Sequence, residues 1–144
     1  MRVARRSLLL CAVTLALTAL SGCGASEQDQ VRAKMSQFVT ATASRDYKAL
    51  CGQVLAPALL ARLAAANVPC EEAMRIALSG VRGPVLSIAR ITVTGDTATA
   101  ITLSGARGQE GSIDSIGLVK TSHGWRVASL GSPITPLTRA PQQQ

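Results

Sequence analysis

The pattern of apolar residues changes once along the chain, near Gly83, and this change most constrains the fold. Before it, apolar side chains recur every three or four residues, which is the spacing of one helix face. After it, β-branched residues alternate with polar ones between short turn sequences, as in strands with one buried face. Helices followed by consecutive strands predict an α+β domain, with the helices on one face of an antiparallel sheet.

The helical part is divided by capping and breaking residues. Ser26 and Asp29 have the spacing of a capping box, so a first helix is expected to begin there. Ser44-Arg45-Asp46 interrupts its apolar stripe, Pro57 suits the first turn of a further helix, and Pro69 opens the last one. The stripe of the first helix consists of Val31, Met35, Phe38, Val39 and Thr42.

The second part predicts a meander of four strands joined by short loops. The turn sequences are Gly95-Asp96 and Ser122-His123-Gly124, with a glycine-rich loop between the two middle strands. Asp114 alternates with apolar neighbours, and we expect its side chain to point outward, away from the helices. The predicted strands are Val85 to Thr94, Thr97 to Leu103, Ser112 to Lys120, and Trp125 to Leu130.

This order of elements resembles the nuclear transport factor two-like superfamily. The resemblance rests on the break near Arg45-Asp46-Tyr47 and on the last strand, Gly124-Trp125-Arg126-Val127, and it covers about Val31 to Leu130. It implies a cone-shaped α+β roll, with N-terminal helices packed on one face of a curved four-stranded antiparallel meander sheet. The superfamily includes ketosteroid isomerase, scytalone dehydratase and many lipid-anchored proteins.

The resemblance also implies a pocket between the helices and the concave face of the sheet. Some members of the superfamily use this pocket for catalysis, and others use it for binding or dimerisation. In this chain the space is either an apolar-walled pocket or a core filled by the small side chains. The residues expected to line it are Met35, Phe38, Tyr47, Leu50 and Trp125.

The N-terminus has the form of an export signal. Three arginines within the first six residues precede an apolar run from Leu8 to Leu20, which is shorter than the roughly 20 residues that span a bilayer. The run ends in Leu20-Ser21-Gly22-Cys23, which resembles the bacterial lipobox, where the cysteine thiol is diacylated and the chain is cut before it. Two acyl chains form a stable anchor. The protein is therefore expected in the cell envelope, outside the cytoplasm and bound to membrane lipid through Cys23.

These segments divide the chain into four regions. The expected regions are a signal peptide over 1–22, the lipidated cysteine and tether over 23–30, the α+β domain over 31–132, and a disordered tail over 133–144.

Cys51 and Cys70 are the cysteines that remain in the mature domain, because Cys11 leaves with the signal peptide. In an exported protein such a pair predicts a disulfide rather than a metal or redox site. Two reduced, buried thiols are the alternative. A metal site would need several ligands, and His123 is the only histidine, so no metal or cofactor is expected.

Arg2, Arg5 and Arg6 leave with the signal peptide, so the net charge of +7 falls to +4 in the mature chain, where the remaining arginines are scattered singly. Proteins that bind nucleic acid concentrate this charge on one face and add stacking aromatic residues. This chain has one Phe, one Tyr and one Trp, so a nucleic-acid partner is not expected.

No set of residues in the sequence predicts catalysis. Acid–base catalysis needs a titratable group and a second group within reach of the same substrate atom. The only candidates are Asp46 and Tyr47 at the break between helices and His123 in a turn, so we expect no catalytic residue.

Three hypotheses about function follow. The first is a lipid-anchored, non-catalytic domain that binds a small apolar ligand or a partner protein. The second is a hydrolase or isomerase with a minimal acid/base pair, which would require a carboxylate or histidine that points into the pocket. The third is a structural or assembly subunit that forms a homodimer through its sheet.

We predict that Cys23 is acylated. Labelled palmitate supplied to the host should enter the wild-type protein and should not enter the Cys23→Ala variant. Equal labelling of the two proteins would show that the lipobox assignment is wrong.

Overall fold

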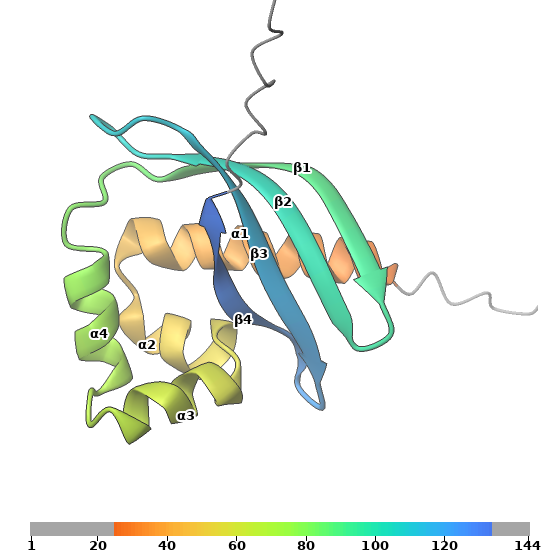
Figure 1. The fold of residues 1–144 in the computed structure, drawn as a ribbon, viewed down its shortest axis with the longest axis horizontal. Helices are drawn as coiled ribbons and strands as arrows, with labels where there is room; N and C mark the ends of the chain where they lie inside the picture. Colours follow the sequence, from red (N-terminus) through yellow and green to blue (C-terminus); the bar gives the residue numbers. More distant parts are fainter. Residues whose placement is uncertain (1–24, 134–144) are drawn as a thin grey trace, which may run out of the picture.

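The computed structural model describes residues 25–133, which form one layer of helices against one sheet (Figure 1). The predicted signal peptide, Cys23 and residues 134–144 lie outside the described residues. Helices come first and strands follow, so the predicted α+β fold is confirmed. The helical elements are α1 (Glu27–Ser44), α2 (Tyr47–Ala49), the π-helical turn η1 (Leu50–Val54), α3 (Pro57–Ala65) and α4 (Cys70–Ala77).

The predicted capping box begins α1. The Ser26 hydroxyl accepts from the backbone N–H of Asp29 at 3.1 Å, and the Asp29 carboxylate accepts from the N–H of Ser26 at 3.3 Å. The helix ends at Arg45, which has a left-handed backbone with φ of 57°. Asp46 then caps α2 by accepting from the N–H of Ala49 at 2.9 Å. The break predicted at these residues is therefore a tight reversal between two capped helices.

The strands form one antiparallel sheet in the order β1-β2-β3-β4, the predicted meander. Extra residues on β4 shift its register against β3 at two places. One extra residue on β1, the exposed Ala89, shifts the register of β1 against β2. β4 also includes Pro133, where we expected the disordered tail to begin. The bounds are β1 (Val85–Thr94), β2 (Thr97–Gly105), β3 (Ser112–Thr121) and β4 (Gly124–Pro133).

Helix α1 covers the inner face of the sheet, where it contacts β1 and β4 (Figure 1). Val31 and Met35 of this helix are fully buried against the sheet. η1 and α3 lie against β4, while α4 packs on the other short helices. The buried side chains of the sheet are Ala98, Ala100, Thr102, Ile116, Leu118, Trp125 and Val127.

Two cations hold the carbonyl end of η1 against its neighbours. Lys34 Nζ donates to the backbone oxygen of Gln53 at 2.9 Å, and Arg126 donates to the oxygen of Gly52 at 2.9 Å. Partial burial, and to a lesser extent the charge of Arg126, lower the pKa of Lys34. These bonds satisfy carbonyls that a helix end leaves without intrahelical donors, and they join α1 and β4 to η1.

The Glu27 carboxylate connects the start of α1 to the sheet. It accepts from Lys120 Nζ at 2.6 Å and from the indole N–H of Trp125 at 2.8 Å. The Trp125 side chain is 2% exposed, so without Glu27 its N–H would need another acceptor at the edge of the core. The bonds from Lys120 and Trp125 lower the pKa of Glu27.

Cys51 and Cys70 are joined by a disulfide, as the sequence predicts, with their Cα atoms 6.0 Å apart. The bond ties η1 to the first residue of α4, and α3 lies inside the closed loop.

We expect Glu27→Gln to lower the melting temperature at neutral pH, because it removes the charge that Lys120 and Trp125 contact. A lowered native pKa stabilises the fold above the ordinary glutamate pKa of about 4.3, and this contribution is lost as the pH falls through the native pKa. The difference in melting temperature between wild type and variant should therefore disappear in acid. Glu110→Gln, at an exposed loop position, is the control. A difference in melting temperature that stays constant with pH would contradict a stabilising role for the Glu27 charge.

The Cys51→Ala/Cys70→Ala variant should be less stable to urea by about 3 kcal/mol, the loop-entropy value for a closed loop of this length. Reductant should lower the wild-type unfolding midpoint to that of the variant and leave the variant unchanged. A wild-type midpoint that does not respond to reductant would refute a stabilising disulfide.

Candidate functional site

An open hollow with a carboxylate in its wall lies between α1 and the inner face of the sheet. Its volume is about 250 Å³, and we call it the Asp114 hollow. It combines apolar walls with a carboxylate from the inner face of the sheet. Its lining residues are Phe38, Ser104, Asp114, Ile116, Leu130 and Gly131.

Asp114 lies on the inner face of the sheet, so the expectation that it points outward is wrong. The pairing of β2 with β3 is regular, which places residue 114 on the same face as the buried Ile116 and Leu118. Ile113 faces the opposite way and is 48% exposed. β3 has apolar residues on both faces, and the face of Ile116 and Leu118 is the inner one because these two side chains are the more buried.

Two serine hydroxyls hold the carboxylate of Asp114. Ser112 Oγ donates to Oδ2 at 2.7 Å, and Ser104 Oγ donates to the same oxygen from the neighbouring strand. The two hydroxyl oxygens are 3.1 Å apart. Within the described residues, Oδ1 accepts no hydrogen bond and Asp114 forms no salt bridge. One oxygen is thus fixed, and the other remains able to accept a hydrogen bond.

The other walls of the hollow are apolar. Phe38 comes from α1, Ile116 from β3 and Leu130 from β4, where Leu130 is 50% exposed. At Gly131 the backbones of β3 and β4 approach so closely that a Cβ atom would collide with the carbonyl of Ser115. The arrangement suits a small molecule with an apolar body and one N–H, O–H or ammonium donor.

The predicted pocket residues divide between this hollow and the core. Phe38 lines the Asp114 hollow. Met35, Leu50 and Trp125 are at most 2% exposed, belong to the packed core and do not line the Asp114 hollow. Tyr47 is half-buried and packs against the same core from α2. Of the two outcomes expected for the space under the sheet, a filled core holds for most of it.

The residues considered for an acid/base pair do not meet. Asp46 caps α2 just beyond the C-terminal end of α1. His123 is exposed in the β3–β4 turn, one residue before the strand whose Trp125 bonds to Glu27. The 18 residues of α1 separate these two places by about 27 Å. Tyr47, the first residue of α2, adjoins Asp46 at this same end of α1.

Sequence analysis missed Ser104, Ser112, Asp114, Leu130 and Gly131. The available signal was the spacing of Asp114 from Ile116 and Leu118, since residues two and four apart share a face of a strand. Ser104 and Ser112 come together because β2 and β3 pair in a particular register. The predicted strand boundaries alone did not determine that register.

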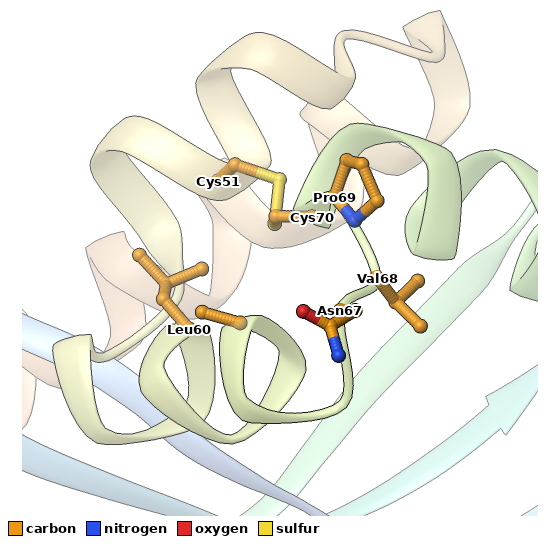
Figure 2. Close-up of a pocket in the computed structure, with 7 residues that line it drawn as sticks. Cys51, Leu60, Asn67, Val68, Pro69 and Cys70 are labelled. Atoms are coloured by element: carbon orange, nitrogen blue, oxygen red, sulfur yellow. A yellow bond between two sulfur atoms is a disulfide. The ribbon is translucent and has the colours of Figure 1, made fainter.

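Two further hollows lie among the short helices. One, of about 360 Å³, lies between α3 and the disulfide (Figure 2), and its polar side chain is Asn67. The other, of about 390 Å³, shares Leu130 with the Asp114 hollow and includes Arg62, which donates to the backbone oxygen of Ala128 at 3.2 Å. Neither contains a carboxylate or a histidine.

Residues 25–133 contain no group of three or more His, Cys, Asp or Glu residues that could hold a metal ion. Among the helices of the same residues, none is long and apolar enough to cross a membrane.

No family model and no curated protein matches the sequence. Two solved structures are similar to the chain, each with a TM-score of 0.48. One is an NTF2-like protein of unknown function from Shewanella baltica OS155, 17% identical, with 72% of this chain and 89% of that chain covered. The other is a proposed dehydratase of the NTF2-like family from Streptomyces avermitilis, 23% identical, with 75% of this chain and 96% of that chain covered.

Proposed function

We propose that this protein is an NTF2-like lipoprotein, anchored outside the cytoplasm through acylated Cys23, whose domain binds a small molecule in the Asp114 hollow without catalysis. The ligand has an apolar body and one hydrogen-bond donor or ammonium group. The observation that carries this proposal is a carboxylate fixed by two serine hydroxyls inside an apolar-walled, open hollow.

Geometry supports binding because the carboxylate is oriented before a ligand arrives. Ser104 and Ser112 both donate to Oδ2, so the plane of the carboxylate is held without occupying Oδ1. A donor on the ligand would reach Oδ1 while its apolar part covers Phe38 and Leu130. Burial of the exposed half of Leu130 adds about 25 cal/mol per Å² of apolar surface removed from water.

The sequence supports the anchor and the location. The N-terminus has the three parts of a lipoprotein signal in the right order: a charged leader, a short apolar run, and then Leu20-Ser21-Gly22-Cys23. The disulfide between Cys51 and Cys70 agrees with an oxidising compartment outside the cytoplasm.

An enzyme of the same fold is the second candidate, because Asp114 supplies one member of an acid/base pair inside a hollow. Its partner groups there are the hydroxyls of Ser104 and Ser112, and the lining contains no histidine, tyrosine or second carboxylate. General acid–base catalysis at neutral pH usually employs such a second group. We therefore favour binding.

Dimerisation through the sheet is the third candidate. On the outer face, Leu103 and Ile113 are paired across β2 and β3 and are 53% and 48% exposed. Among the described residues, Val85 is the other large exposed apolar residue on this face of the sheet. A patch of three side chains is small compared with the roughly 800 Å² that each partner of a stable interface buries. This comparison makes a dimer the weaker proposal.

The proposal is tested by native mass spectrometry of the protein purified from its own host in mild detergent. Wild type should carry a small-molecule adduct. Phe38→Ala and Asp114→Asn should each lose most of it, because one removes an apolar wall and the other removes the charge that the donor contacts. Ile113→Ala, on the outer face of the same strand, is the matched control and should keep the adduct.

Equal adduct on wild type and Asp114→Asn would refute the Asp114 hollow as the site. Conversion of the released molecule by wild type, lost in Asp114→Asn, would establish the enzyme instead. A doubled mass that Ile113→Lys abolishes would establish the dimer.

A further inference from the structure

We infer that the end of the domain formed by the start of α1 and by the β1–β2 and β3–β4 turns faces the membrane lipid, and that the Asp114 hollow lies at the far end. The inference rests on acylation of Cys23, part of the function proposed above. It adds that the ligand enters the hollow from the aqueous side and not from the bilayer.

The tether is too short to let the start of α1 leave the lipid surface. Cys23 precedes Glu27 by four residues, and a fully extended chain covers at most about 3.6 Å per residue. An acyl-carrying Cys23 in the headgroup region therefore keeps Glu27 within about 14 Å of it.

Hydrogen bonds bring both hairpin turns to the same end as Glu27. Lys120 and Trp125, which flank the β3–β4 turn, donate to the Glu27 carboxylate. The backbone N–H of Lys120 also donates to the oxygen of Asp96 in the β1–β2 turn at 2.8 Å. The start of α1 and both turns thus form one surface, which we call the tether end; Figure 1 shows the two turns at the lower ends of their strands.

Two independent lengths separate the tether end from the Asp114 hollow. Along α1, Phe38 lies 11 residues beyond Glu27, or about 17 Å at 1.5 Å per residue. Along β3, Asp114 lies seven residues before Thr121, or about 23 Å at 3.3 Å per residue. Both lengths begin where Glu27 meets Lys120 and end in the same hollow, since Phe38 and Asp114 both line it.

The tether end keeps some unpaired negative charge. Glu27 is paired with Lys120, but within residues 25–133 the carboxylates of Asp29, in the capping box, and Asp96, in the β1–β2 turn, form no salt bridge. The tether sets the orientation, and electrostatic attraction to anionic lipid is not required.

The test measures the distance of single labelled cysteines from lipid. In the mature chain Cys23 is acylated and Cys51 is bonded to Cys70, so an introduced cysteine is the one reactive thiol. Ser122→Cys places a fluorescent donor at the tether end, and Gln109→Cys places it in the β2–β3 loop at the opposite end. The acylated protein is reconstituted in phosphatidylethanolamine/phosphatidylglycerol vesicles with an acceptor dye on the lipid headgroup.

With a Förster distance close to the length of β3, transfer from Ser122→Cys should be several-fold greater than transfer from Gln109→Cys. A flexible spacer of about 20 Gly/Ser residues inserted after Gly24 is the control, because its root-mean-square length of roughly 25 Å should largely remove the difference. Equal transfer from the two sites in acylated protein without the spacer, or greater transfer from Gln109→Cys, overturns the inference alone. Absence of acyl chains on Cys23 by mass spectrometry refutes the proposed anchor together with it.

Discussion

Within residues 25–133 the four-stranded sheet has no second sheet to pack against, so its inner face is removed from water mainly by α1. Val31 and Met35 supply the apolar contact, and Glu27 supplies the acceptor that lets the indole of Trp125 be buried. A chain with a single tryptophan and a single phenylalanine has few large side chains with which to fill this space. Correct placement of one helix therefore determines whether the core forms.

The same helix also determines where the core stops and the Asp114 hollow begins. Small and polar inner residues, Ser104 and Gly131, lie beyond the packed region, and Phe38 is the residue that α1 contributes to the hollow. A hollow results because neither strand nor helix offers a side chain large enough to fill it. The carboxylate is tolerated on the inner face because two hydroxyls and an open side toward solvent satisfy it.

Local signals were sufficient for most of the fold. Ser26 and Asp29 placed the start of α1, and Gly95-Asp96 placed the first hairpin turn, because capping and turn chemistry act within a few residues. The candidate site was predicted only at Phe38. Asp114 was assigned to the wrong face because Ile113 and Ile116 both look like core residues, and only the packing of the whole sheet distinguishes them. The π-helical turn at Leu50 had no sequence signal at all.

The covalent ring closed by Cys51 and Cys70 has a consequence for how the domain responds to proteolysis. Asn67 lies inside the ring, in an exposed turn with a left-handed φ of 55°, where a protease finds accessible backbone. A cut at this turn would leave the two new chain ends joined through sulfur, with α3 and α4 still attached to the rest of the domain. The ring thus converts a cut at this exposed turn into a nick that releases no fragment.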